Sequence, residues 1–427
     1  MVSKNKLKIL VINRWVGYNE GGNETHIKDL MAWFIKVGHE VHVITTKGDK
    51  LEHMRGKLHL HYVNSKQGYY SYGALGIVFA LIFDIKCLFK FLELYISGIR
   101  FDVMSIHFAL EAVLARFIKL FFGIPYVMIL AGDTPIELIE AKRADGKIQI
   151  SEFMNDQCKK YGYSSEIIPK GFDLKRFNPE IETKDLIESL GVKGKKIILT
   201  VCRLDPRKNL ISLIESADII VNKKKNKDFV FLIAGDGVER DLLLEEIKKH
   251  KLEGVVRLVG SVSNTSNLLP KYYAMSDLYV LPTLYEGFGW VFLEAMASGL
   301  PIITTNVASN PEIVGDVGKL VPLKNPKVLA ETILETLNDR KELSKMTKLG
   351  LEKAQRFTWE EQIKKYDAYY FKVSKNKCNS LSCKLSVFSS AVRDISDLFI
   401  SLIKDKVIFN FRSKESNWRP AGQEGGK

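Results

Sequence analysis

The sequence predicts an α/β protein built from two Rossmann-like, parallel-sheet domains. Near the N-terminus, apolar strands expected at residues 8–13 and 41–45 enclose a glycine turn and a helix expected at 24–37, which is a βαβ unit. The same alternation restarts after Pro179. The chain has 427 residues, which at about 150 residues per domain suits two or three domains.

The first unit continues with two further buried strands, at 103–107 and 126–130. Strands that alternate with helices form a parallel sheet that helices cover on both faces. Residues 77–96 form an apolar helical segment with one polar stripe, Lys86, Lys90 and Glu93. We interpret it as a core helix with one solvent-exposed edge. The alternative is a helix that faces the acceptor or a lipid.

The second unit repeats this architecture. Its expected strands are 196–201, 229–234, 255–258, 278–281 and 301–304, with helices at 210–223 and 239–249. We therefore expect an N-terminal domain over 1–175, a C-terminal domain over 176–357, a helix at 358–373 that packs back on the first domain, and a basic amphipathic tail at 374–427.

Composition excludes several classes of protein. Hydrophobic residues make up 46% and charged residues 26%, so the chain is not disordered. Five cysteines with no CxxC argue against a disulfide framework or a zinc site and indicate a reducing compartment. The longest apolar run, residues 73–83, is shorter than the about 20 residues of a spanning helix, and no signal-peptide pattern opens the chain. We expect a cytoplasmic protein.

The tail carries much of the net charge of +13. Residues 372–427 contain 11 basic and 5 acidic residues, and Phe388, Val392, Ile395, Phe399 and Leu402 recur at helical spacing. The tail is then either a helix packed on the protein body or an element that docks on an anionic membrane surface. No nucleic-acid-binding motif accompanies the charge, so we expect no nucleic-acid partner.

Two loops have residues suited to phosphate. Gly21 and Gly22 follow the first strand and open a helix, an arrangement that lets backbone N–H groups approach an anion; no P-loop motif occurs. Arg203 and Lys208 follow the strand that ends at Val201, and a guanidinium with an ammonium suits a diphosphate. Taken alone, a Gly-Gly turn is often a plain helix cap, and surface charge is a reasonable explanation of the Arg203 and Lys208 pair.

The most specific stretch is residues 284–296. Glu286 lies in a glycine loop after a strand, and Glu294 follows eight residues later, about two turns into the next helix. The loop N–H groups can hold a sugar or phosphate, and the two carboxylates can accept hydrogen bonds from hydroxyl groups. Two loop carboxylates around Gly287, Phe288 and Gly289 are hard to explain by packing.

No metal is predicted at the site, and no cofactor. The sequence has no Asp-x-Asp. His39-Glu40-Val41-His42 is one residue short of HExxH, and it lies at the start of a strand, where the helical geometry of that zinc motif is absent.

Together these segments resemble glycosyltransferase family 4, the retaining group 1 enzymes of the GT-B fold, over residues 7–373. The glycine motif at 21–26, Gly38-His39-Glu40-Val41, Ser151 to Met154, Lys170 to Asp173, the Gly235-Asp236-Gly237 turn and the Glu-x7-Glu pair carry the resemblance. It implies two facing domains, a nucleotide-diphosphate sugar as donor, and a glycan or lipid-linked acceptor.

The resemblance also implies residue roles. Arg203 and Lys208 would stabilise the leaving diphosphate. Glu286, with the backbone of 287–289, would hold the transferred sugar, and Glu294 would bind the ribose hydroxyls. Gly21, Gly22, Gly235 and Val262 would complete the donor site, with Val262 against the base, and His26 and Asp133 are the candidates on the acceptor side.

Two departures from the family pattern leave alternatives open. Ala131 stands where many members have a histidine, and Lys170 replaces the usual asparagine before Gly-x-Asp. Ala131 keeps open a non-catalytic nucleotide-sugar-binding protein. Another GT-B enzyme, such as a nucleotide-sugar epimerase or a phosphorylase, is a further alternative to a transferase.

Overall fold

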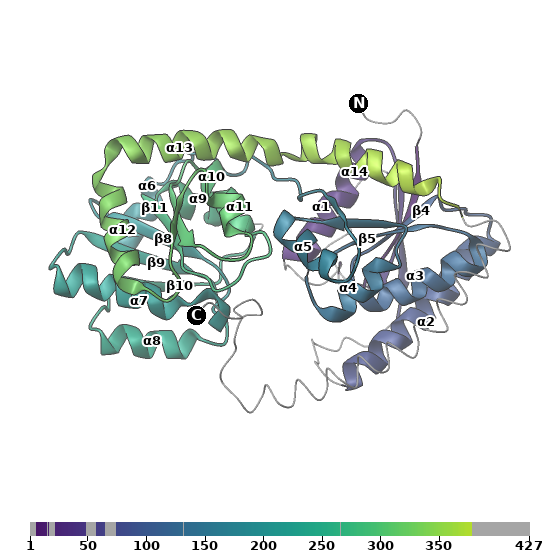
Figure 1. The fold of residues 1–427 in the computed structure, drawn as a ribbon, viewed down its shortest axis with the longest axis horizontal. Helices are drawn as coiled ribbons and strands as arrows, with labels where there is room; N and C mark the ends of the chain where they lie inside the picture. Colours follow the sequence, from purple (N-terminus) through teal and green to yellow (C-terminus); the bar gives the residue numbers. More distant parts are fainter. Residues whose placement is uncertain are drawn as a thin grey trace.

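The computed structural model describes residues 6–14, 16, 22–47, 57–64, 74–130, 132–264 and 266–377. Gly21, Ala131 and the amphipathic stripe of the tail lie outside these residues. The described chain forms two lobes, each with one parallel sheet, as Figure 1 shows. The predicted pair of parallel-sheet α/β domains is confirmed, whereas the exact domain limits stay a prediction.

The first lobe contains a seven-stranded sheet in the order β3-β2-β1-β4-β5-β6-β7. Its strands are β1 (Lys8–Ile12), β2 (Glu40–Thr46), β3 (Leu58–Val63), β4 (Val103–Ile106), β5 (Tyr126–Ile129), β6 (Gly146–Gln149) and β7 (Glu166–Ile167). Its helices are α1 (Gly22–Lys36), α2 (Ala74–Ile96), α3 (Ala109–Phe122), α4 (Pro135–Lys142) and α5 (Glu152–Lys160).

Local chemistry explains several of these helix ends. Helix α3 stops at Gly123, which takes the left-handed conformation (φ 72°) and donates its N–H to the Lys119 carbonyl. Helix α4 starts at Pro135 behind Thr134, and helix α5 starts behind Ser151, whose side chain accepts a hydrogen bond from the Met154 N–H.

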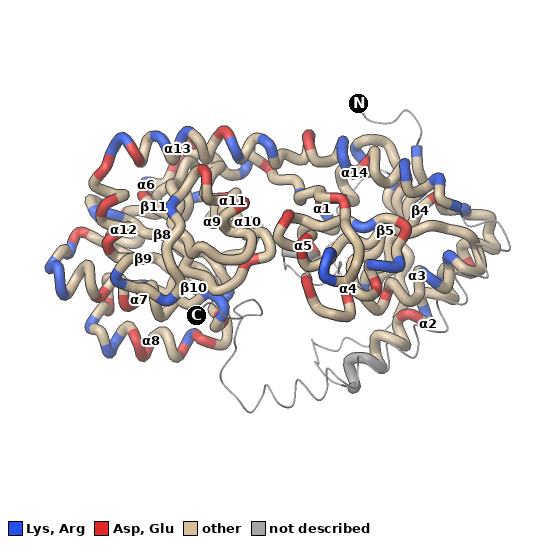
Figure 2. The backbone as a smooth tube through the Cα atoms, in the orientation of Figure 1, with Lys and Arg blue, Asp and Glu red and all other residues tan. Residues whose placement is uncertain are grey.

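The second lobe contains a six-stranded sheet in the order β10-β9-β8-β11-β12-β13. Its strands are β8 (Lys196–Val201), β9 (Phe229–Ala234), β10 (Val256–Gly260), β11 (Leu278–Leu281), β12 (Ile302–Thr305) and β13 (Lys319–Val321). Its helices are α6 (Lys184–Leu190), α7 (Leu210–Asp218), α8 (Arg240–Lys249), α9 (Leu268–Ala274), α10 (Trp290–Ala297), α11 (Asn310–Val314), α12 (Pro326–Asn338) and α13 (Arg340–Ala354). Basic and acidic residues are interspersed along outer helices such as α13 (Figure 2).

The last described helix, α14 (Trp359–Ser374), returns the chain to the first lobe. It continues the line of α13 across the molecule and lies over the first sheet (Figure 1). Trp359, Tyr366 and Tyr370 are buried against the core of that lobe, and Asp367 pairs with His39 at 2.8 Å. The aromatic face of α14 therefore ties the two lobes together.

Four strands are absent from the sequence expectations: β3, β6, β7 and β13. Each is polar or short; β3 reads LHLHYV and β6 reads GKIQ. Tertiary pairing with a neighbouring strand, rather than hydrophobic content, makes them strands. Helix α7 is also shorter than expected, because residues Ile219–Lys223 continue it as a π-helical turn. Within the described residues, no helix has both the length and the apolarity to cross a bilayer.

Candidate active site

Two loops of the second lobe meet at the carboxyl ends of β8 and β11. The first contains the 3₁₀ turn Pro206–Lys208, in which Asp205 caps the N–H of Arg207. The second is held to it because the Leu284 N–H and the Thr283 hydroxyl both donate to the Arg207 carbonyl, at 2.6 and 2.9 Å. These bonds bring the Lys208 ammonium against the Glu286 carboxylate, where the two form an ion pair.

The Arg203 side chain reaches into solvent beside this pair. It is 75% exposed and lies 3.6 Å from the Asp205 carboxylate. The exposed guanidinium leaves one cationic group available to an anion, next to the Lys208 ammonium that Glu286 already pairs. Such a position in an open α/β sheet is where ligands bind.

The Gly-Asp-Gly turn after β9 packs against the loop that bears Arg203. A Cβ atom on Gly235 would lie 1.8 Å from the Cys202 carbonyl oxygen, and one on Gly237 would lie 2.4 Å from that of Leu204. Both glycines have φ in the region that side chains rarely adopt, at +149° and +159°. Glycine is therefore required here so that the two loops can touch.

The Gly287-Phe288-Gly289 segment leads into α10. Gly289 has φ +79° and precedes the first helical residue, and a Cβ there would lie 2.5 Å from the Phe292 ring. The Phe288 side chain is buried against Trp290 and Phe357. Only the backbone groups of this residue can therefore contact a bound ligand.

Glu294 lies just over one turn into α10, rather than the two turns that we expected, because the helix begins only at Trp290. The Tyr273 hydroxyl donates a hydrogen bond of 2.7 Å to its Oε2 atom. Burial raises the pKa of Glu294, and this hydrogen bond partly opposes that rise. Tyr273 thus fixes one carboxylate oxygen and leaves the other to a ligand.

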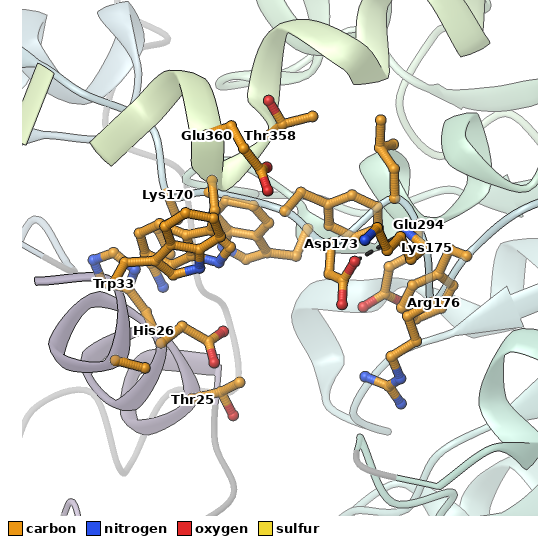
Figure 3. Close-up of a pocket in the computed structure, with 18 of the residues that line it drawn as sticks. Thr25, His26, Trp33, Lys170, Asp173, Lys175, Arg176, Glu294, Thr358 and Glu360 are labelled. Atoms are coloured by element: carbon orange, nitrogen blue, oxygen red, sulfur yellow. Dashed lines mark hydrogen bonds between the residues drawn. The ribbon is translucent and has the colours of Figure 1, made fainter. Parts of the chain in front are cut away.

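A cavity of about 600 Å³ separates the lobes beside Glu294. Figure 3 shows His26 and Trp33 of α1 on one side and Glu294 and Arg176 on the other. Thr358 and Glu360 at the start of α14 lie above them. Ligand cavities commonly form at such domain interfaces.

The acceptor-side candidates lie on the first lobe, in different settings. His26 is buried and stacks on Trp359, with ring centroids 5.7 Å apart, and burial holds the pKa of His26 well below its usual value. Asp133 instead accepts a hydrogen bond of 2.5 Å from the Tyr285 hydroxyl, next to Glu286. Asp133 therefore lies near the loop that bears Glu286, whereas the neutral His26 lines the cavity.

Other contacts join the two lobes around this loop. The Ser151 hydroxyl donates to the Gly287 carbonyl at 2.8 Å. The Glu312 carboxylate of α11 accepts the N–H groups of Glu152 and Phe153, at 3.0 and 3.2 Å, at the N-terminus of α5. A carboxylate from one lobe thus caps a helix of the other.

The remaining candidates make no direct polar contact with the site among the described residues. Val262 follows β10 and packs against the core of the second lobe. Gly22 is the first residue of α1. The motifs did not single out Tyr273, Arg176 or Glu312, since none belongs to a local pattern; only the fold brings them to the site.

Comparisons with known proteins bear on the family. A model described as "Glycosyltransferase Family 4" matches residues 20–176, and one described as "Glycosyl transferases group 1" matches residues 182–353. The chain is 29% identical over 201 residues to the O-antigen chain mannosyltransferase B of Escherichia coli, which covers 47% of this chain and 50% of that protein. The chain thus spans about half the length of that relative.

Two further relatives extend the comparison. An Escherichia coli UDP-Gal:α-D-GlcNAc-diphosphoundecaprenol α-1,3-galactosyltransferase is 31% identical over 57% of this chain and 62% of its own length. The N-acetyl-α-D-glucosaminyl L-malate synthase of Bacillus anthracis is 25% identical over 84% of this chain and 96% of its own.

Solved structures share the fold. A sucrose-phosphate synthase from Thermosynechococcus elongatus has a TM-score of 0.71 at 21% identity, covering 86% of this chain and 99% of that chain. Anabaena HepE, in complex with UDP and glucose, has a TM-score of 0.67 at 20% identity, with the same coverage. The predicted GT-B fold is confirmed, and the chain belongs to the group 1 glycosyltransferases of family 4.

Proposed function

We propose that this protein transfers a hexose, with retention and without a metal, from a nucleotide-diphosphate sugar to a glycan or lipid-linked acceptor. The observation that carries the proposal is the ion pair of Lys208 with Glu286, beside the exposed Arg203, at the carboxyl ends of β8 and β11. This arrangement puts two cations and a carboxylate together on the second lobe, although these three residues do not line the cavity between the lobes.

The cations suit the leaving group. When the sugar–phosphate bond breaks, negative charge develops on the diphosphate, and fixed positive groups stabilise it without reorganisation. Arg203 and Lys208 supply this charge, so that no metal ion is needed at the diphosphate. The loop that leads into α10 adds backbone N–H groups near the same position.

The carboxylates suit the neutral parts of the donor. When the diphosphate of the donor binds the Lys208 ammonium, the Glu286 carboxylate loses its ion-pair partner. The carboxylate then accepts hydrogen bonds from hydroxyls of the transferred sugar. Glu294 takes the ribose hydroxyls with the oxygen that Tyr273 leaves available. With front-face attack, a donor phosphate oxygen takes the acceptor proton, so the protein need not supply a general base.

The curated relatives support a sugar donor of this class and differ in acceptor. The galactosyltransferase is named for a diphosphoundecaprenol acceptor, and the synthase for malate. The acceptor of this chain would enter from the first lobe, past Asp133. The Tyr285 hydroxyl holds Asp133, so this hydrogen bond links the loop of Asp133 to the loop that bears Glu286.

A donor screen tests the proposal. Thermal shifts with UDP-, GDP- and ADP-sugars identify the donor, because a ligand at 100 times its Kd stabilises by about 2.7 kcal/mol. Anomeric NMR of the product then reports retention, and turnover in excess EDTA reports the need for a metal. Binding without turnover or donor hydrolysis would instead identify a non-catalytic nucleotide-sugar-binding protein, and an inverted anomer would contradict the mechanism.

We also propose peripheral contact with an anionic membrane. Helices α2 and α3 pack together and leave large apolar side chains exposed, including Leu81, Ile85 and Phe89 on α2 and Phe117 and Phe121 on α3. Lys377, the last described residue, pairs with Asp102 of the first lobe at 3.4 Å, and the basic residues of the tail follow it in the sequence. An exposed apolar surface together with a basic segment supplies the two signals that stable interfacial binding needs.

A further inference from the structure

The first lobe has a cluster of histidines that the transfer chemistry does not use. Glu40 and His42 lie on β2 and His59 and His61 on β3. The parallel register pairs His42 with His59, so that side chains two residues apart on each strand share one face of the sheet. The cluster lies at the amino ends of these strands, the opposite end from the candidate active site.

Three ligand atoms converge there. Glu40 Oε1 is 2.8 Å from His42 Nε2 and 3.6 Å from His59 Nε2, and all three atoms lie within 4.8 Å of one another. Around a tetrahedral zinc ion with bonds of about 2.0–2.1 Å, ligand atoms are roughly 3.3 Å apart. The observed separations differ from that value by amounts that small side-chain movements can supply.

The surroundings of His42 suit a ligand. Its ring is almost fully buried and lies edge-on to Phe101, with centroids 5.2 Å apart. Its other nitrogen, Nδ1, lies 2.9 Å from His61 Nε2. A metal-binding histidine commonly donates its second ring N–H to a neighbouring acceptor, which fixes the tautomer and the ring orientation. His61 is placed to be that acceptor.

We propose that Glu40, His42 and His59 form a site for a divalent transition-metal ion, with zinc as its simplest occupant. Two imidazoles and one carboxylate are a zinc-binding set, and the 49% exposed His59 leaves a fourth position open to water. The ion would link β2 to β3, which among the described strands is an edge strand that pairs with β2 alone. It would act in stability and not in transfer.

Two existing interactions of Glu40 compete with a metal ion, and the first is its hydrogen bond with His42 Nε2, which an ion would replace. The Lys8 ammonium of β1 lies 2.8 Å from the same Glu40 oxygen. Metal binding requires this oxygen to turn to the ion, while the second carboxylate oxygen can keep Lys8. The proposal therefore predicts changes of opposite sign: removal of a ligand weakens metal binding, and removal of the lysine charge strengthens it.

Calorimetric titration of the tag-free, full-length chain with ZnCl₂ tests the proposal. We expect one zinc ion per chain, at least tenfold weaker binding in His59→Ala and Glu40→Gln, and severalfold tighter binding in Lys8→Met. His250→Ala, which removes an imidazole from the second lobe, is the matched control and should bind like the wild type. Zinc should also raise the melting temperature of the wild type and of His250→Ala but not of His59→Ala.

Two results would overturn the site. One is no zinc binding by the wild type. The other is equal affinity in the wild type and His59→Ala. Either result is independent of glycosyl transfer, since the titration uses no sugar donor.

Discussion

The Lys208 ammonium and the Glu286 carboxylate form an ion pair between two loops whose residues are 78 positions apart in the sequence. Their side chains are only 12% and 16% exposed. The pair places a cation for the diphosphate directly beside a carboxylate for the sugar. A ligand that carries both a diphosphate and sugar hydroxyls can replace the ion pair, because the diphosphate binds Lys208 and the hydroxyls bind Glu286.

Removal of either cation should slow transfer. Each charged hydrogen bond contributes roughly 1.5–3 kcal/mol, so Arg203→Ala and Lys208→Ala should each lower turnover at least tenfold without unfolding the protein. Initial rates with the identified donor measure this. Lys223→Ala, which removes an exposed ammonium from the same lobe, is the control. Near-normal rates in both site variants would refute the diphosphate assignment.

The two carboxylates should differ in effect. Glu286→Gln should lower the transfer rate, because it removes charge from the sugar position. Glu294→Gln should mainly weaken the binding of free nucleoside diphosphate, because it acts on the ribose. Titration calorimetry and initial rates separate the effects, and unchanged nucleotide affinity in Glu294→Ala would contradict the ribose role.

Tyr273 should act through Glu294. Tyr273→Phe removes the 2.7 Å hydrogen bond that fixes the carboxylate, so we expect nucleoside diphosphate affinity to fall about three- to tenfold. Tyr272→Phe is the matched control, because it deletes a hydroxyl from the adjacent position of α9. The same affinity in both variants would show that Tyr273 has no positioning role.

Removal of the Glu312 carboxylate, which caps helix α5 of the other lobe, should let the two lobes separate. Glu312→Ala leaves two N–H groups at the start of α5 without their carboxylate, a loss typically of about 1 kcal/mol. The contact between the lobes should then be about fivefold less favoured, and small-angle scattering should give a larger radius of gyration. Glu335→Ala, on the exposed side of α12, should leave the scattering curve unchanged.

Lys170 should make stability depend on pH. Burial lowers the pKa of Lys170 to about 8, against an ordinary value of 10.5, although Glu24 and Asp29 oppose the shift. Between these values the unfolded chain binds more protons than the folded chain, so this residue makes stability rise with pH over that window. Below pH 8 both states are protonated, and the cost of burying the charge is present in full.

Urea unfolding at pH 8 and pH 10 measures this effect. Lys170→Asn should be more stable than the wild type at pH 8, with the difference shrinking toward pH 10. Lys175→Asn should show the same dependence of stability on pH as the wild type, because the Lys175 side chain is exposed. A constant difference between Lys170→Asn and the wild type across this range would contradict the predicted linkage.

The chain should sediment with anionic liposomes at low salt, and high salt should weaken this binding. Removal of residues 374–427 should leave both lobes folded and abolish most of the binding, because the tail carries the excess charge. Neutral vesicles are the control. Equal sedimentation of the shortened chain would contradict the role of the tail, and an unfolded shortened chain would show that the tail packs on the body.

Much of the fold could be predicted because buried parallel strands are continuous apolar runs. Strands β8 and β9 read KIILTV and FVFLIA, and both lie where expected. Strand β3 could not be predicted in this way. It lies at the edge of the sheet, five of its six side chains are partly or fully exposed, and its histidines mask the apolar pattern.

The sequence by itself determined the fold class, the family and the loops that carry the site, because these depend on hydrophobic runs and on spacing along one stretch of chain. Only the tertiary structure decided which side chains meet. Lys208 reaches Glu286, Tyr273 holds Glu294, Glu312 caps a helix of the other lobe, and His59 joins Glu40 and His42. Such pairs arise from strand order and domain closure, which place distant residues together and leave no periodic signal in the sequence.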